Sequence, residues 1–361
     1  MACLPRFLKF NSSRERVDRK EVVYGDLEIM RREEGKDCYK GCVDDDDDFS
    51  ARRYRWDEIE RMTLNFSRTI GCGGFSTVYL AHLPSSTFGA IKVHSSGDYL
   101  SRVFKQELNI LRRLDHQTIV KLLGYSDDRE EGALVFEYVP NGSLQDKLHG
   151  QATESRKGVL SWKRRMAIAF QLAQALDYLH EKCDLQIVHG DIKPSNILLD
   201  EKLNCKLCDF GLAKMGFSSM IMPSSRTKQV MMGSPGYTDP QYLRTGISSK
   251  KNDVYSYGVI VLELVTGMKA FCEDRGQLLT SIMAPLLRDV EKCEAIRVSE
   301  VVDPRLKGEV DLGEAKTMLH ISALCLGHQG TLRPSATNIV HTIQHQVSSI
   351  SFLFSSKKAK Y

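Results

Sequence analysis

The chain is organised around the stretch Ile187-Val188-His189-Gly190-Asp191-Ile192-Lys193-Pro194-Ser195-Asn196-Ile197-Leu198-Leu199, and Cys208-Asp209-Phe210-Gly211 follows shortly after it. Two apolar runs, Gln186–Val188 and Ile197–Leu199, predict short buried strands at the two ends of this stretch. Between them lies a polar loop whose backbone is restricted by Pro194. A polar loop held between rigid strands is a common position for reactive side chains.

The loop and the Asp-Phe-Gly turn contain the residue types that phosphoryl transfer requires. Asp191 can accept a proton from an attacking hydroxyl, and Lys193 can neutralise phosphate charge. Asn196 and Asp209 offer the hard oxygen ligands that Mg²⁺ prefers. The alternative is an ordinary polar turn followed by an Asp-Phe-Gly turn. That alternative leaves the motifs described next without an explanation.

A glycine-rich hairpin and a strand bearing one lysine precede the loop. The hairpin is predicted over Ile70-Gly71-Cys72-Gly73-Gly74-Phe75-Ser76-Thr77-Val78-Tyr79-Leu80, where small residues let backbone N–H groups approach phosphates closely. The strand is Ala90-Ile91-Lys92-Val93, and a predicted helix over residues 99–114 places Glu107 beside its apolar face. We predict that Glu107 pairs with Lys92; the alternatives are a plain hairpin and two unrelated surface charges.

The whole set resembles the glycine-rich loop, V-A-I-K strand, catalytic loop and metal-binding turn of the eukaryotic protein kinases. This resemblance covers residues 56–345. Three phrases are similar to the plant receptor-like kinase branch related to Pelle: L-V-F-E-Y-V-P-N-G-S-L at 134–144, D-V-Y-S-Y-G-V-I-V-L-E-L-V-T-G at 253–267, and L-R-P-S at 332–335. Without a predicted transmembrane span, the chain resembles a receptor-like cytoplasmic serine/threonine kinase.

The resemblance implies an α+β, two-lobed fold. A small β-rich N-lobe with one key helix is expected over residues 59–140, and a larger, mainly helical C-lobe over residues 141–345. Residues 1–58 contain the acidic run Asp44–Asp48 and few periodic apolar positions, so we expect them to be mostly disordered. A loose tail is expected over residues 346–361.

The resemblance also implies roles for individual residues. Asp191 accepts or orients the substrate hydroxyl, and Lys193 steadies the γ-phosphate of ATP. Lys92, held by Glu107, sets the α- and β-phosphates; the metal, Mg²⁺ or alternatively Mn²⁺, is held by Asn196 and Asp209. The implied nucleotide-binding residues are Ile70, Gly71, Cys72, Gly73, Gly74, Phe75, Ser76, Val78, Ala90, Lys92, Glu137, Val139, Asn196 and Leu198.

The function implied is transfer of the γ-phosphoryl group of MgATP to serine or threonine hydroxyls of proteins in intracellular signalling. Lys193, two residues after Asp191, resembles the serine/threonine version of the loop. The alternative is a nucleotide-binding pseudokinase that acts as a scaffold in a receptor complex, which the family departures Ser76, Gly190 and Gln241 favour. A pure interaction protein that binds no nucleotide explains none of the core motifs.

Composition restricts the partners and the compartment. The net charge of +4, from 50 basic and 46 acidic residues, is too balanced to indicate a nucleic-acid partner. Ten cysteines without a regular framework, and no signal-peptide core, favour a reducing, cytoplasmic location. The apolar run Tyr257–Val265 is too short to cross a bilayer. Acylation of Cys3 would instead place the chain peripherally at the plasma membrane, where a membrane receptor kinase is the expected partner.

Two departures from the family carry consequences. Gly190 stands where many kinases have an arginine that is neutralised by a phosphorylated activation segment. Gln241 stands where the family has a glutamate that is the buried partner of Arg333. An amide still accepts a hydrogen bond, but loss of the charge is worth roughly 1 to 2 kcal/mol, so we expect a less firmly held C-lobe.

We predict from Gly190 that phosphorylation between residues 218 and 238 is not the main on-switch. Replacing the hydroxyl-bearing residues of this segment by alanine is expected to leave transfer of labelled phosphate largely intact. Loss of transfer in a variant that still folds would contradict the prediction.

Overall fold

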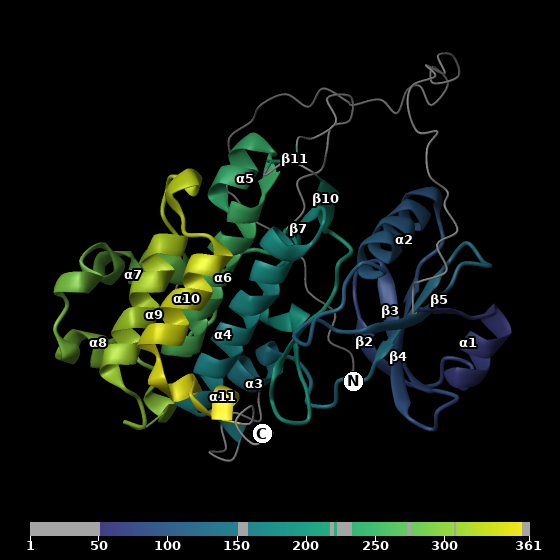
Figure 1. Ribbon diagram of the computed structural model, residues 1–361, viewed down its shortest axis with the longest axis horizontal. Helices are drawn as coiled ribbons and strands as arrows, with labels where there is room; N and C mark the ends of the chain where they lie inside the picture. The colour runs from purple at the N-terminus through teal and green to yellow at the C-terminus, as the bar shows by residue number, and fades with distance from the viewer. Residues whose placement is uncertain are drawn as a thin grey trace, which may run out of the picture. The chain divides into compact units, whose positions relative to one another are not determined.

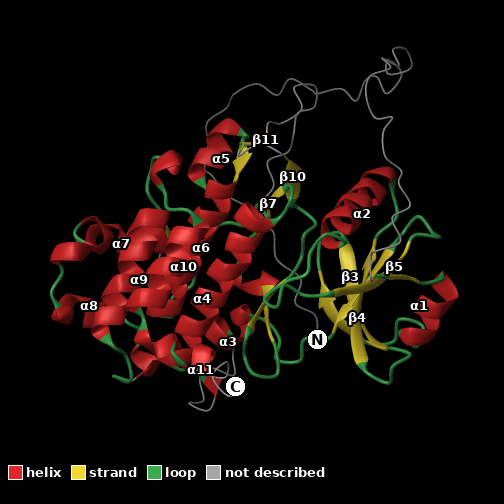
Figure 2. Cartoon of the chain, in the orientation of Figure 1, coloured by secondary structure: helices red, strands yellow, loops and turns green. Residues whose placement is uncertain are grey.

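The computed structural model describes residues 51–150, 158–216, 220–221, 233–272, 276–306 and 308–355 (Figure 1). Cys3, the acidic run Asp44–Asp48 and the rest of residues 1–50, which we expect to be mostly disordered, lie outside the described residues. Figure 2 shows that strands dominate the part before residue 140 and helices the part after it. This confirms the expected α+β, two-lobed arrangement.

The N-lobe contains one six-stranded sheet with the order β1-β5-β6-β4-β3-β2. Its strands are β1 (Arg52–Arg53), β2 (Thr69–Cys72), β3 (Ser76–His82), β4 (Phe88–His94), β5 (Leu122–Ser126) and β6 (Ala133–Glu137). Alternate residues of β4 point to opposite faces: Ile91 packs with α1 (Trp56–Met62), whereas Lys92 contacts α2 (Asp98–Leu111). The sheet therefore separates a purely apolar face from the face that carries the predicted charge pair.

The C-lobe is built on α6 (Lys250–Thr266), in which every residue from 253 to 266 is buried. The sequence is apolar nearly all round this helix, as expected for a helix at the centre of a lobe. Ser249 caps its start through Asn252, and Gly267, with φ of 68°, ends it in the left-handed conformation that glycine adopts without strain. α4 (Trp162–Asp177) and α9 (Leu312–Cys325) pack against it.

The remaining helices surround this centre (Figure 1). They are α3 (Leu144–His149), α5 (Pro240–Thr245), α7 (Leu279–Arg288), α8 (Ala295–Val301), α10 (Ala336–Gln346) and α11 (Phe352–Ser355). No helix among the described residues combines the length and apolar character needed to cross a bilayer.

Short two-stranded ladders shape the loops of the C-lobe. Those at the predicted loop are β7 (Gln186–Val188) with β10 (Lys214–Gly216), and β8 (Ile197–Leu199) with β9 (Cys205–Leu207). The two apolar runs that flank the polar loop are thus strands, as predicted. Farther away, β11 (Met220–Ile221) pairs with β12 (Ser248–Ser249), and β13 (Phe271–Cys272) with β14 (Gln277–Leu278).

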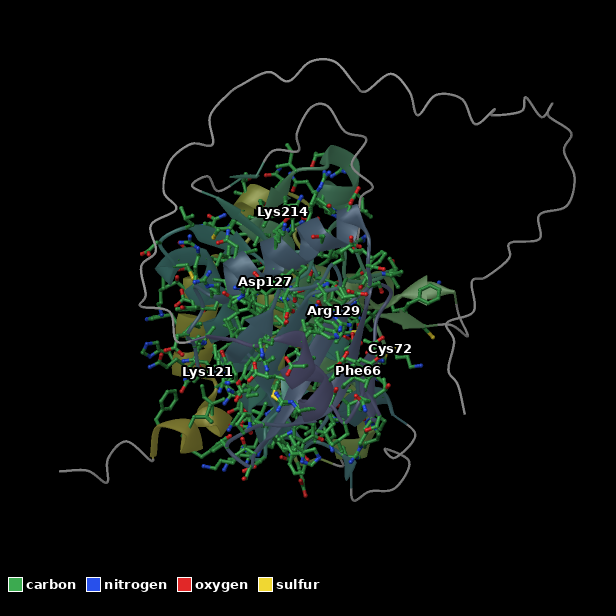
Figure 3. All side chains as sticks on the ribbon, turned by 90° about the vertical axis from the view of Figure 1, so that its right-hand side faces the viewer. Phe66, Cys72, Lys121, Asp127, Arg129 and Lys214 are labelled. Carbon is green, nitrogen blue, oxygen red and sulfur yellow. The ribbon has the colours of Figure 1, made fainter. Side chains whose placement is uncertain are left out.

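The folded unit begins before residue 59, where the N-lobe was expected to start. β1 pairs in parallel with β5, and Trp56 and Ile59 of α1 are buried against the sheet. Arg53 pairs with Asp127 at 2.7 Å, and Arg129 lies over the Trp56 ring, 5.0 Å from its centroid. Asp127 and Arg129 are labelled in Figure 3. The helical spacing of Trp56, Ile59 and Met62, all buried, is the sequence signal for this earlier start.

The C-terminal segment is also more ordered than expected, because residues 347–355 pack on the C-lobe. Val347 and Ile350 are buried. Glu314 of α9 accepts hydrogen bonds from Ser348 Oγ (2.9 Å), from Ser349 N (2.8 Å) and from Ser349 Oγ (2.6 Å). The same carboxylate accepts a bond from Trp162 Nε1 at 2.8 Å. One buried carboxylate therefore holds the segment to the lobe.

We predict that Glu314→Ala lowers the free energy of unfolding by about 2 to 4 kcal/mol, because it leaves the buried Trp162 donor and the half-buried Ser349 donors without their acceptor. Urea unfolding measures the change. The control is Glu309→Ala, at an exposed position, which is expected to stay within about 0.5 kcal/mol of wild type. Equal stabilities of the two variants would contradict this role of Glu314.

Candidate active site

A buried carboxylate at the start of α6 fixes the backbone of the polar loop. Asp253, 1% exposed, accepts hydrogen bonds from His189 N (2.9 Å), Gly190 N (2.8 Å) and His180 Nε2 (2.9 Å). Gly190 has φ of +79°, and a Cβ on it would lie 3.1 Å from Leu212 O. The loop therefore suits a glycine here and is tied directly to the central helix.

His189 joins the loop to the Asp-Phe-Gly turn. Its Nδ1 accepts a hydrogen bond from Asp191 N (3.2 Å), so the proton is assigned to Nε2, which donates to Cys208 O (3.1 Å). The His189 ring also meets Phe210 edge-on, with centroids 4.8 Å apart. One histidine thus fixes the spacing between the loop with Asp191 and the turn with Asp209.

Asp191 lies among groups that hold its carboxylate in one orientation. Lys193 Nζ is 2.7 Å from Asp191 Oδ2, and Ser234 Oγ donates to Asp191 Oδ1 at 2.8 Å. Ser234 Oγ in turn accepts from Lys193 Nζ at 2.9 Å. Asn196 Nδ2 donates to Asp191 Oδ2 (3.1 Å) and to Asp191 O (2.9 Å). The structure therefore brings together the predicted Asp191, Lys193 and Asn196.

Lys92 is shared between two carboxylates. Its Nζ lies 2.8 and 2.9 Å from the oxygens of Glu107 and 2.8 Å from Asp209 Oδ1. The Glu107 side chain is 1% exposed, whereas the Asp209 side chain is 46% exposed. The predicted pairing of Glu107 with Lys92 is present, and Asp209 adds a second anion to it.

Charge pairing keeps the buried Lys92 and Glu107 ionised, together with the half-exposed Asp209 beside them. Burial alone would lower the pKa of Lys92, but the charges of Glu107 and Asp209 outweigh it and raise that pKa. Burial would raise the pKa values of both carboxyl groups, but Lys92 lowers them, that of Asp209 to about 2. At neutral pH one cation therefore faces two anions, an imbalance that favours a metal ion at the exposed side of Asp209.

The donor set fits a hard divalent ion. Asn196 uses its Nδ2 for the bonds to Asp191, so within the described part of the chain its Oδ1 remains available as a ligand. Asp209 offers a half-exposed carboxylate. The described residues contain no group of three or more His, Cys, Asp or Glu side chains placed to bind a metal. Two protein oxygens with water and phosphate in the other positions is the usual arrangement for Mg²⁺.

The predicted nucleotide-binding residues come from neighbouring strands. Ile70, Gly71 and Cys72 belong to β2, Ser76 and Val78 to β3, and Ala90 to β4, while Gly73, Gly74 and Phe75 form the turn between β2 and β3. Val78 is paired with Lys92, and Ala90 with Phe136. Figure 3 shows Cys72 on the N-lobe. The sheet register therefore places most of the predicted binding strands side by side.

The segment that joins the lobes contributes the remaining residues. Glu137 ends β6, and its side chain accepts from Lys121 N (2.9 Å) and from Lys206 Nζ (2.6 Å). Val139 follows as a buried residue, and Leu198 of β8 is half-buried. The Glu137 side chain is thus held by the two lysines at the segment that joins the lobes.

Ser234 and Asp253 are the site residues that sequence reasoning missed. Ser234 lies 43 positions after Asp191, in a serine-rich segment, so its hydroxyl gave no signal by itself. Asp253 gave one: it is an acid near the start of a helix that is apolar nearly all round. Thr238 Oγ1 donates to Ser234 O (2.9 Å), so the alanine test on residues 218–238 has to spare Ser234 and Thr238. Residues 217–219 and 222–232 of that segment lie outside the described residues.

The expectation for Gln241 was wrong. Arg333 does not bind Gln241; its Nη1 and Nη2 lie 2.5 and 3.0 Å from the carboxylate oxygens of Asp239. Gln241 Oε1 instead accepts from Gly330 N at 3.1 Å. Asp239, two residues earlier at the start of α5, reaches the guanidinium, so the charge-assisted pair is retained. The inference of a less firmly held C-lobe is therefore withdrawn.

Comparison with known proteins agrees with this geometry. A family model described as "Protein kinase domain" matches residues 64–344. A probable receptor-like protein kinase of Arabidopsis thaliana is 52% identical over 82% of this chain and 89% of its own length. The rice protein named salt tolerance receptor-like cytoplasmic kinase 1 is 49% identical over 85% of this chain and 84% of its own. A probable LRR receptor-like serine/threonine-protein kinase of Arabidopsis thaliana is 35% identical, and the match covers 33% of its length.

We predict that Asp253→Ala lowers the free energy of unfolding by about 3 to 5 kcal/mol, because the buried His189 N–H, the Gly190 N–H and the buried His180 ring lose their acceptor. Thermal unfolding tests this, with Asp289→Ala, whose side chain is 65% exposed, as the matched control. Hydrogen exchange at residues 189 and 190 is expected to accelerate in the first variant alone. Unchanged exchange there would show that the loop does not depend on Asp253.

Proposed function

Because the chain belongs to the protein kinase family and its relatives are plant receptor-like kinases, we propose that it transfers the γ-phosphoryl group of MgATP to serine or threonine hydroxyls of proteins. The observation that carries this proposal is the assembled set Asp191, Lys193 and Ser234, together with a Lys92 that is already held by Glu107 and Asp209. Each charged position that the chemistry needs is filled.

Asp191 receives or orients the substrate hydroxyl. Its Oδ2 accepts from Asn196 and pairs with Lys193, while its Oδ1 accepts from Ser234. These partners hold the carboxylate in place, so little reorganisation is needed when a hydroxyl approaches. Lys193, 25% exposed, keeps its ammonium group beside Asp191, where it can balance the charge of the transferred phosphoryl group.

Lys92, Asn196 and Asp209 bind and orient the nucleotide. Lys92 would contact the phosphates with its ammonium, which Glu107 keeps in position from α2. Asn196 Oδ1 and the Asp209 carboxylate would hold Mg²⁺, with Mn²⁺ as the alternative ion. Bound MgATP supplies the phosphoryl group and the charge that screens it; the chain itself contributes positioning and electrostatic stabilisation.

Serine or threonine is the proposed acceptor, supported by Lys193 in the loop and by relatives named as serine/threonine kinases. We further propose action in the cytoplasm on protein substrates, next to a membrane receptor kinase; the name of the rice relative supports this setting. Attachment to the plasma membrane through an acylated Cys3 remains a prediction for a position outside the described residues.

The test is transfer of labelled γ-phosphate from MgATP to the protein itself and to a basic protein substrate. Asp191→Asn is expected to lower the rate by about 10²- to 10⁴-fold, because the carboxylate that orients the hydroxyl is lost. Asp184→Asn, at an exposed position, is the matched control and should match wild type. The label is expected on serine or threonine.

Two outcomes oppose the proposal in different ways. If wild type binds MgATP but neither it nor the control transfers label, the pseudokinase scaffold replaces the kinase. If Asp191→Asn transfers label as fast as wild type, the assignment of Asp191 is wrong.

A further inference from the structure

Two side chains of one strand approach the same carboxylate. Lys92 and His94 are two residues apart in β4 and therefore lie on the same face of the sheet, towards α2. Lys92 Nζ contacts both oxygens of Glu107, and His94 Nε2 lies 3.3 Å from Glu107 Oε2. His94 is 3% exposed and Glu107 1% exposed. The imidazole is thus inside the same closed space as the charge pair.

His94 is an unusual choice for this position if it serves only packing. Its ring meets Phe104 of α2 edge-on, with centroids 5.5 Å apart, which a phenylalanine could equally do. Neither ring nitrogen makes a well-aligned hydrogen bond within the described residues, although both are buried. A buried polar group that lacks a full partner destabilises a fold. An apolar residue would avoid that loss, so the imidazole points to a role other than packing.

The charge arrangement around Lys92 indicates what that role is. An ammonium group has three donors, and Lys92 directs them at the two oxygens of Glu107 and at Asp209 Oδ1. A phosphate that takes one of these donors weakens the hold of Lys92 on Glu107. Glu107, which is 1% exposed, would then have less of its charge paired away from water, which is costly. His94 Nε2 is the other side-chain nitrogen that the described structure places near Glu107, and in the Nε2–H tautomer it can donate.

We propose that His94 is a positioning residue for Glu107. Its Nε2–H binds Glu107 Oε2 and keeps α2 against the sheet when Lys92 turns towards nucleotide phosphate. This inference rests on the proposed kinase function for its consequence in catalysis. The contact itself belongs to the chain alone and can be measured without nucleotide.

Two substitutions separate a donor from a packing ring. His94→Gln places an amide N–H near the position of Nε2, whereas His94→Phe keeps a ring against Phe104 but has no donor. The first readout is hydrogen exchange of the α2 amides in the nucleotide-free protein, with wild-type Lys92 and with Lys92→Met. The second is kcat and the KM for MgATP, measured with wild-type Lys92.

The proposal predicts that His94→Phe raises the hydrogen-exchange rate of the α2 amides about threefold when Lys92 is present. In the Lys92→Met background, Glu107 depends on His94 alone, so His94→Phe is expected to raise that rate about tenfold or more. His94→Gln is expected to stay within about twofold of its parent in both cases. With Lys92 present, His94→Phe is expected to lower kcat about fivefold while the KM for MgATP changes less than twofold, and His94→Gln to restore most of kcat.

A packing role makes the opposite prediction: phenylalanine would be as good as histidine in both readouts, and that result would overturn the proposal. If Lys92→Met does not fold, the comparison of His94→Phe with His94→Gln in the presence of Lys92 is enough to distinguish a donor role from a packing role. Absence of phosphotransfer in wild type would count against the kinase function only, because the exchange measurement on α2 is independent of activity.

Discussion

Sharing of Lys92 between Glu107 and Asp209 is the interaction on which the rest of the site depends. The two carboxylates come from different places, one from α2 in the N-lobe and the other from the turn after β9 in the C-lobe. A buried charge is tolerated only while it is paired, so loss of Lys92 would leave the buried Glu107 carboxylate without its cation. The ion arrangement therefore fixes α2 on the sheet and the Asp-Phe-Gly turn next to it. The same arrangement leaves one negative charge in excess at the half-exposed Asp209, where a divalent cation is favoured.

Asp253 is a second buried carboxylate on which the site depends. It fixes the loop from His189 to Asn196, as Lys92 fixes the side of the site where the nucleotide is proposed to bind. Asp253 belongs to α6, which is buried almost throughout, and it bonds directly to the backbone at His189 and Gly190. The Asp191 and Lys193 side chains thus lie on a short loop whose backbone is hydrogen-bonded to a helix that is buried almost throughout. His189 in turn donates a hydrogen bond to Cys208 O, which fixes the loop relative to Asp209, the next residue along the chain. Positioning of this kind is the main contribution that a protein makes to phosphoryl transfer, because the nucleotide carries the chemistry.

Much of this arrangement could be predicted from the sequence, because its motifs combine local signals with a familiar order. The lysine strand, the amphipathic helix with Glu107 and the loop from His189 to Asn196 each have their own periodicity or spacing. Other features depend on contacts between distant residues. Ser234 reaches Asp191 across 43 positions, and Asp239 rather than Gln241 meets Arg333 across 94. The segment at residues 347–355 looked loose because its serines are polar, yet Glu314 satisfies them. Partners of buried charges are set by the tertiary fold and leave little trace in a local pattern.

We propose that Lys92, Asn196 and Asp209 form a binding site for a nucleotide with its metal ion. Calorimetric titration of the protein with a non-hydrolysable ATP analogue, with and without Mg²⁺, tests this proposal. Wild type is expected to bind the analogue at least about tenfold more tightly with Mg²⁺, a difference of about 1.4 kcal/mol, and Asp209→Asn is expected to lose this difference. Equal affinity with and without Mg²⁺, or no binding of the analogue at all, would show that these residues do not form such a site.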